Sequence, residues 1–291
     1  MQTTQGWQGM EVDLCRAVAA AVLNDAQSVR FRSIAGEQGY SALQSGDLDI
    51  LVRHNDWTML ADTALGLTFV APWFYREQGF LARTPQASGG IQDLAGRKIC
   101  SYTATDREID LSDLIINQAG NTKNAAKIEN VSFPSFGIAL KAFENKLCDA
   151  IGGELIQLRI SARSLEDTDK LQIIRDNSGP SATGPLIRQQ DQEWFKIVRW
   201  TINWIIKAEQ LGLTQETISQ IDADNPVYPV IRQAGFSGVS LGLSENWAAQ
   251  IILQVGNYGE IFQRYFSEYQ VDRGINRLME DGGLHVAPPM K

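Results

Sequence analysis

The chain has 291 residues, of which 44% are hydrophobic and 21% are charged, and this composition is typical of a globular protein with a sizeable core. Its formal net charge of −8 disfavours nucleic acid as a partner, because phosphate binding needs a basic surface. No apolar run reaches the ~18 residues of a membrane span, and the polar residues after Met1 do not resemble a secretory signal.

The first part of the chain alternates between predicted helices and strands. Apolar residues at helical spacing predict a helix over 12–22, and residues 41–44 form a second, short one. Residues 29–32 alternate like a half-buried strand, and apolar runs predict strands at 48–52 and 79–83. This order favours an α/β fold with mainly parallel sheets and helices on both faces.

A segment rich in turn-forming residues, 84–90, marks the start of a second lobe. Within it we expect strands at 98–102, 127–133, 148–151 and 171–174, and helices at 110–118, 136–143 and 154–161. Residues 184–188 are extended and lead back to the first lobe. We therefore assign residues 1–82 with 188–291 to lobe 1, and residues 83–187 to lobe 2.

The last third of the chain is predicted to be helical. Apolar residues on one face indicate a long helix over 194–211, and Thr214 is placed to cap another. A further helical pattern over 245–266 is interrupted by Gly256 and Gly259. Ligands of α/β folds of this kind lie at the carboxyl ends of the strands.

Motifs of covalent catalysis and of cofactor binding are absent from the sequence. It contains no Gly-rich phosphate loop and no Gly-x-Ser-x-Gly elbow. The two histidines, His54 and His285, are far apart in sequence, and the three cysteines show no metal-ligand spacing. We therefore expect a binding protein and not an enzyme, without a metal or a cofactor. The odd number of cysteines leaves at least one thiol without a partner in the chain.

Several blocks of the sequence, in the same order along the chain, resemble the periplasmic general L-amino-acid-binding proteins of ABC importers. The blocks are residues 6–19, 56–58, 78–80, 192–211, 254–260 and 282–289. The resemblance implies a two-lobed periplasmic-binding-protein fold of type 2 with a ligand cleft between the lobes. It also implies a periplasmic or extracytoplasmic location, closure by hinge motion and docking on an ABC permease.

The resemblance also gives expectations for the cysteines. Cys100 and Cys148 match a disulfide pair of the family, and a bridge there implies an oxidising compartment; the alternative is two buried free thiols. Chains of the family begin with a strand ahead of the position of Gly6, and a cysteine on that strand pairs with the position of Cys15. By this comparison the chain looks shortened ahead of Gly6, which makes Cys15 the odd cysteine. A sheet that lacks a strand leaves an unpaired edge or a gap, so if the shortening is natural we expect a tendency to form a homodimer.

The ligand positions of lobe 1 depart from the family. The family binds the ligand carboxylate with an Arg three residues after the position of Thr58, where this chain has Ala61, and an Arg fork suits a carboxylate. The two other matching positions are His54 and Asp56, and Trp57 lies beside them. Each has another interpretation: His54 as a satisfied polar residue, Asp56 as a turn cap, and Trp57 as core.

In lobe 2, the resemblance assigns the ligand ammonium group to Glu154. Its alternative role is to interact with the dipole of the helix that it opens. In the family's anion-binding loop Thr105 keeps its role, whereas Arg107 is new and is alternatively a solvated loop residue.

Without the Arg at position 61, an amino acid bound in the family manner loses on the order of a hundredfold in affinity. One explanation is that Arg107 or Arg53 takes over the carboxylate. Another is that the ligand is a different small polar molecule, of a cationic kind given Asp56 and Glu154. The third explanation is a repurposed scaffold that senses or assembles with partners and no longer carries an amino acid.

Overall fold

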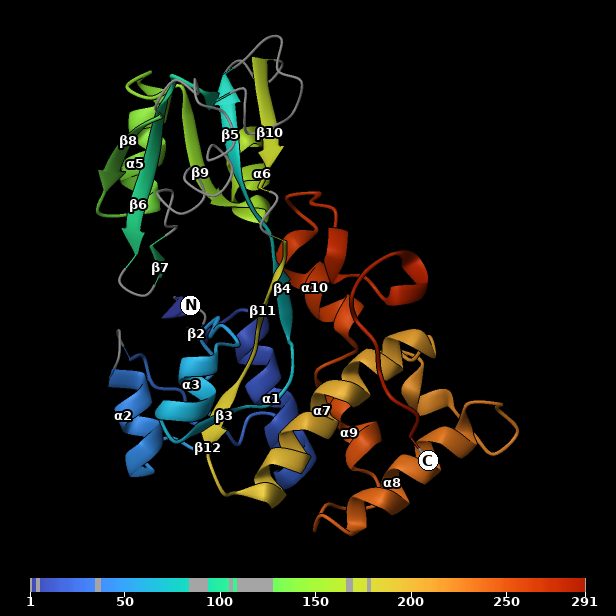
Figure 1. The fold of residues 1–291 in the computed structure, drawn as a ribbon. Helices are drawn as coiled ribbons and strands as arrows, with labels where there is room; N and C mark the ends of the chain where they lie inside the picture. Colours follow the sequence, from blue (N-terminus) through green and yellow to red (C-terminus); the bar gives the residue numbers. More distant parts are fainter. Residues whose placement is uncertain are drawn as a thin grey trace. The chain divides into compact units, whose positions relative to one another are not determined.

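The computed structural model describes residues 2–3, 6–34, 38–83, 94–104, 107–108, 128–165, 170–176 and 179–290 (Figure 1). The chain divides into two compact units: unit 1 is Met1–Tyr75 with Ala182–Lys291, and unit 2 is Arg76–Ser181. The chain leaves unit 1 within strand β4 (Phe74–Arg76) and returns within β11 (Ser181–Thr183), and these two strands pair with each other. The lobe boundaries expected from the sequence stay a prediction.

Unit 2 is built on a sheet that mixes parallel and antiparallel pairs. Among the described residues its order is β10-β5-β9-β6-β7, and β8 pairs with β6. The strands are β5 (Gln78–Arg83), β6 (Lys98–Ala104), β7 (Arg107–Glu108), β8 (Glu129–Phe133), β9 (Ala150–Glu154) and β10 (Leu171–Arg175). β6 is parallel to β8 and β9, whereas β5 is antiparallel to β9 and β10. The sheet is therefore mixed, not mainly parallel as the alternation of elements indicated.

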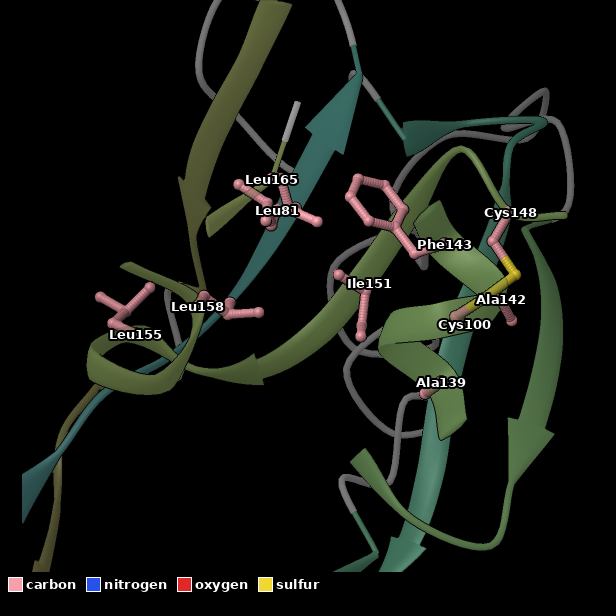
Figure 2. Packing of buried hydrophobic residues seen from close by; sticks show 10 residues of the cluster. All are labelled: Leu81, Cys100, Ala139, Ala142, Phe143, Cys148, Ile151, Leu155, Leu158 and Leu165. Carbon is pink, nitrogen blue, oxygen red and sulfur yellow. A yellow bond between two sulfur atoms is a disulfide. The ribbon is translucent and has the colours of Figure 1, made fainter. Parts of the chain in front are cut away.

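Helices α5 (Phe136–Glu144) and α6 (Leu155–Ser164) pack on this sheet. Ser135 starts α5, because its side chain accepts a hydrogen bond from the backbone N–H of Ile138. Apolar side chains of both helices meet those of β5 and β9 in one buried cluster (Figure 2); its members include Leu81, Phe143, Ile151, Leu155 and Leu158.

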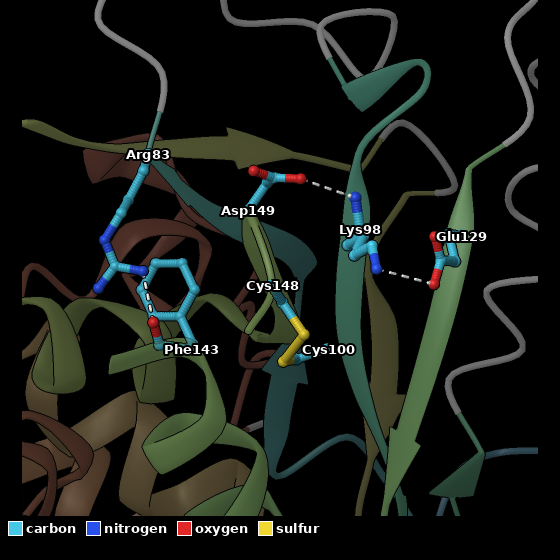
Figure 3. Close-up of a disulfide and its surroundings, with 7 residues drawn as sticks. All are labelled: Arg83, Lys98, Cys100, Glu129, Phe143, Cys148 and Asp149. Carbon is cyan, nitrogen blue, oxygen red and sulfur yellow. Dashed lines mark hydrogen bonds and ion pairs between the residues drawn. A yellow bond between two sulfur atoms is a disulfide. The ribbon is translucent and has the colours of Figure 1, made fainter. Parts of the chain in front are cut away.

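A buried disulfide joins Cys100 of β6 to Cys148, two residues before the start of β9 (Figures 2 and 3). The expected pair is thus confirmed. Since the bridge closes a sequence separation of 48 residues, it stabilises unit 2 by about 4 kcal/mol through restriction of the unfolded chain. Cys15 has a free thiol, and burial raises its pKa to about 12, so the thiol is protonated at neutral pH.

Unit 1 is largely helical. Its helices are α1 (Met10–Leu23), α2 (Gln38–Ser45), α3 (Met59–Ala64), α7 (Gln192–Gln210), α8 (Tyr228–Val239), α9 (Trp247–Gln254) and α10 (Tyr258–Phe266). Its described strand pairs are short and antiparallel: β1 (Gln2–Thr3) with β2 (Gly6–Trp7), and β3 (Leu67–Phe69) with β12 (Leu186–Arg188). The expected homodimer through a sheet edge stays a prediction.

The last third of the chain is helical, as the sequence indicated, with two exceptions. α7 begins where Asp191 caps the N–H of Trp194, and Gly256 breaks the pattern into α9 and α10 with a φ of 97°. Thr214 and Thr217 bond each other, but only a short 3₁₀ turn, Ile218–Gln220, follows them. α8 was not predicted.

Two expected strands of unit 1 do not form. Residues 29–32 alternate in burial, yet they pair with no strand among the described residues, and Phe31 packs on Trp7 at a ring-centroid distance of 5.7 Å. In the segment 48–52, Leu51 alone makes a bridge, to Leu186. The helix expected at 110–118 lies outside the described residues. In the part of the chain that the structure describes, no helix combines the length and the apolarity of a membrane span.

Candidate ligand-binding site

The four site residues predicted in unit 1 lie on one loop. The chain that returns from unit 2 is hydrogen-bonded to both ends of this loop. Leu51 exchanges two backbone hydrogen bonds with Leu186, each 2.9 Å long, and the N–H of Trp57 donates to the carbonyl of Ala182 at 3.1 Å. Asn55 is buried inside the loop, where its Nδ2 donates to the carbonyl of Leu51 at 2.9 Å. Sequence reasoning missed Asn55, because its bonding partner is set by the loop and not by a motif.

His54 has a left-handed backbone, with a φ of 48°. Its backbone N–H donates to the carboxylate of Glu11, and its Nδ1 lies 2.8 Å from Oε1 of Glu11. The imidazole is exposed, and its carboxylate partner comes from the first turn of α1. This geometry fits the interpretation of a polar residue that is satisfied within unit 1.

Trp57 and Thr58 open helix α3. Trp57 is 60% exposed, and its ring stacks on Phe69, with ring centroids 5.2 Å apart and planes 4° from parallel. The Thr58 Oγ1 accepts the N–H of Ala61 at 3.2 Å as the cap of α3. Ala61 is buried and uncharged, and the backbone of Asp56 bridges to Thr183.

Glu154 lies in unit 2, at the end of β9 and directly before α6. Its Oε1 accepts a hydrogen bond of 2.9 Å from Nη1 of Arg76, whose side chain is 5% exposed against 21% for Glu154. Although Glu154 occupies the cap position of α6, its side chain makes no capping bond. The carboxylate is thus held by a buried cation and still reaches solvent.

Tyr102 stands near the end of β6, which runs parallel to β9, so Tyr102 and Glu154 share the carboxyl edge of the sheet. Its hydroxyl lies 3.4 Å from Oε1 of Gln157, and its ring packs edge-on against Phe136. Sequence reasoning missed Tyr102, Gln157 and Arg76; the position of Tyr102 at the end of a predicted strand was the signal that could have identified it.

Thr105 lies outside the described residues, and the structure describes only the backbone of Arg107, in β7. His54, Asp56, Trp57 and Thr58 therefore belong to unit 1, and Glu154 and the backbone of Arg107 to unit 2. Within the described residues, no cluster of three His, Cys, Asp or Glu side chains could hold a metal ion.

No family model matches the chain. Curated proteins, however, are similar to it over almost its whole length. It is 32% identical to the putative amino-acid ABC transporter-binding protein YhdW of Escherichia coli, and 33% identical to the general L-amino acid-binding periplasmic protein AapJ of Rhizobium johnstonii. Both alignments cover 98% of this chain and 84% of the relative.

Solved structures that resemble this chain include periplasmic binding proteins. A periplasmic binding protein from Brucella ovis with glutathione bound is 32% identical and superposes with a TM-score of 0.82, over 99% of this chain and 91% of its own. The Neisseria gonorrhoeae solute receptor for L-cysteine is 15% identical with a TM-score of 0.52, over 72% of this chain and 80% of its own, which indicates a shared fold.

Proposed function

Because this chain belongs to the family of amino-acid ABC-transporter solute-binding proteins, we propose that it captures a small polar solute outside the cytoplasm and delivers it to an ABC permease. Capture proceeds by closure of two lobes on the ligand and needs no covalent chemistry. The buried disulfide between Cys100 and Cys148 supports a location in an oxidising compartment such as the periplasm.

The proposed ligand carries an ammonium group, and Glu154 is the observation that carries this proposal. Although its Oε1 accepts a bond from Arg76, the Glu154 side chain is 21% exposed, so its negative charge is accessible to a ligand N–H. It also lies at the carboxyl end of a sheet strand, the usual place of ligands in α/β folds. Asp56 supplies a second acidic group from unit 1, and the exposed Trp57 suits an apolar part of the ligand.

An amino acid and a small peptide both meet this description. The Brucella ovis relative with glutathione bound supports including peptides that carry a γ-glutamyl group. The buried Ala61 supplies no charge for a ligand carboxylate. We therefore assign that group to Arg107 or Arg53, as the sequence suggested.

A thermal-shift screen tests the proposal. The panel holds the twenty L-amino acids, reduced and oxidised glutathione, polyamines and small organic acids. A ligand present at a hundred times its Kd stabilises the native state by about 2.7 kcal/mol, which raises Tm by several degrees. We expect a shift with one ammonium-bearing class and with none of the organic acids.

The variant E154Q should lose this shift. The matched control is E77Q, since Glu77 also pairs with an arginine of unit 2, Arg175, at 2.7 Å. It should keep the shift. A folded protein that no compound of the panel stabilises would contradict solute capture and favour the repurposed scaffold.

A further inference from the structure

The last residue of unit 1 before the chain enters unit 2 is held by a side chain 201 positions later in the sequence. The N–H of Tyr75 donates to Oδ1 of Asn276 at 2.7 Å, and the Tyr75 carbonyl accepts from Nδ2 of Asn276 at 2.7 Å. Asn276 is 2% exposed. A carboxamide places an acceptor oxygen and an N–H donor side by side in one plane, so Asn276 stands in for a neighbouring β-strand at this residue.

Asn276 is itself fixed in place. Its carbonyl accepts hydrogen bonds of 3.2 Å and 2.8 Å from the guanidinium of Arg273, which also forms a bidentate ion pair with Glu209 of α7. The ring of His285 packs on Tyr75, with centroids 5.2 Å apart, and on Tyr258 at 4.2 Å. The segment 273–285 therefore binds the outgoing strand to the helices of unit 1.

The next residues of the chain are bound just as firmly to unit 2. The side chain of Arg76 pairs with Glu154, and the carbonyl of Glu77 accepts the N–H of Leu155 at 2.9 Å. The carbonyl of Gln78 accepts the N–H of Asp176 at 3.0 Å. The backbone N–H and carbonyl of Tyr75 are thus hydrogen-bonded to unit 1. The carbonyls of Glu77 and Gln78 are hydrogen-bonded to unit 2.

We infer that Asn276 is a positioning residue that fixes the unit 1 end of the outgoing strand and thereby confines the bending of this strand to the backbone torsions of Arg76. The inference rests on the proposed function, since lobe motion is what the confinement serves. The returning strand is held at the same end, where Trp57 donates to Ala182. The predicted ligand residues Trp57 and Glu154 therefore neighbour the attachment points of the two connecting strands.

The test measures the spread of inter-lobe distances in the ligand-free protein. Spin labels are placed on exposed Ser41 of α2 and exposed Ser164 of α6, both changed to Cys in a Cys15→Ala background, and double electron–electron resonance gives the distance distribution. Asn276→Leu keeps the number and the branching of the side-chain heavy atoms and removes both bonds to Tyr75. We expect a wider distribution than in the parent.

The matched control is Asn257→Ala. Asn257 is another buried asparagine of unit 1 that joins two segments, since it caps α10 and donates to the carbonyl of Leu213 at 2.7 Å. It should keep the parent width even though it lowers stability. An unchanged distribution in Asn276→Leu, or equal widening in Asn257→Ala, would overturn the inference.

If Asn276→Leu does not fold, amide exchange of the unmodified protein decides. The Tyr75 amide must then exchange far more slowly than an exposed loop amide, and exchange at the exposed rate would overturn the inference. Neither measurement uses a ligand. A negative thermal-shift screen would therefore count against the proposed function alone. An unchanged distance distribution in Asn276→Leu would count against the role of Asn276 alone.

Discussion

At the scale of single residues, the pair of Arg76 and Glu154 combines two environments. The guanidinium is buried, whereas the carboxylate reaches solvent. Removal of one partner from a buried pair leaves the other charge uncompensated, and this costs more than the loss of an exposed pair. The pair is therefore expected to matter for the stability of unit 2 as well as for the ligand.

We predict that Glu154→Gln lowers the free energy of unfolding by about 1 to 2 kcal/mol, because Arg76 loses its counter-charge but keeps an acceptor. Glu77→Gln, at a pair whose arginine is 55% exposed, should cost about 0.5 kcal/mol or less. All seven tryptophans lie in unit 1, so urea unfolding of these unit 2 variants is followed by circular dichroism. Equal costs for the two variants would contradict the buried character of the Arg76 pair.

His285 provides a second residue-scale prediction. Burial, with a further contribution from Arg273, lowers the pKa of its imidazole from 6.5 to about 3. The folded state keeps His285 neutral while the unfolded state binds a proton below pH 6.5. The stability that this group contributes is therefore complete above pH 6.5 and is lost as the pH falls toward 3.

The variant His285→Phe should remove this pH dependence. Between pH 6 and pH 4, the free energy of unfolding of the parent should fall more steeply than that of the variant, by at most about 1.4 kcal/mol per pH unit. Denaturation of unit 1 at each pH is followed by tryptophan fluorescence. Parallel pH profiles would show that His285 becomes protonated in the folded state.

At the scale of elements, two helix glycines have opposite surroundings. A Cβ on Gly238 of α8 would lie 2.2 Å from Nε1 of Trp247, the atom that donates to the carbonyl of Ala234 at 2.9 Å. A Cβ on Gly137 of α5 would meet nothing within 4 Å. The contact between α8 and α9 therefore requires a glycine, whereas α5 does not.

Gly238→Ala should destabilise unit 1 by about 2 kcal/mol, because displacement of Trp247 outweighs the roughly 1 kcal/mol by which alanine favours a helix. Gly137→Ala should stabilise unit 2 by about 0.5 kcal/mol, from helix propensity alone. Thermal denaturation of both variants gives the two signs. A stabilising Gly238→Ala would mean that α8 moves away from α9 without cost.

At the scale of the whole molecule, the comparisons confirm the resemblance and the two-lobed fold that it implied. The connection by β4 and β11 leads to a prediction about shape in solution. Saturation with a compound that gives a thermal shift should lower the radius of gyration measured by small-angle X-ray scattering, because closure brings the lobes together. The comparison compound is one from the panel that gives no shift. An unchanged radius with a bound ligand would contradict closure.

The family and the expected disulfide between Cys100 and Cys148 came from the resemblance that the sequence carries. The sequence by itself determined the helices and strands whose apolar spacing reports burial, such as α7, β6 and β10. Periodicity carries this information because it depends on which side of an element is buried. Only the tertiary structure decided where backbone groups find partners. The segment 48–52 looks like a strand, yet Trp194 and Arg188 side chains take the carbonyls of Asp49 and Leu48.

The same limit applies to the candidate site and its supports. Glu154 and Trp57 could be named from the family blocks, but the partners Arg76 and Phe69 could not. The bonds between Asn276 and Tyr75 join residues 201 positions apart, and no local pattern marks either one. Hydrogen bonds of this kind are satisfied only when the packed elements bring donor and acceptor within about 3 Å, so the folded chain and not its local sequence selects them.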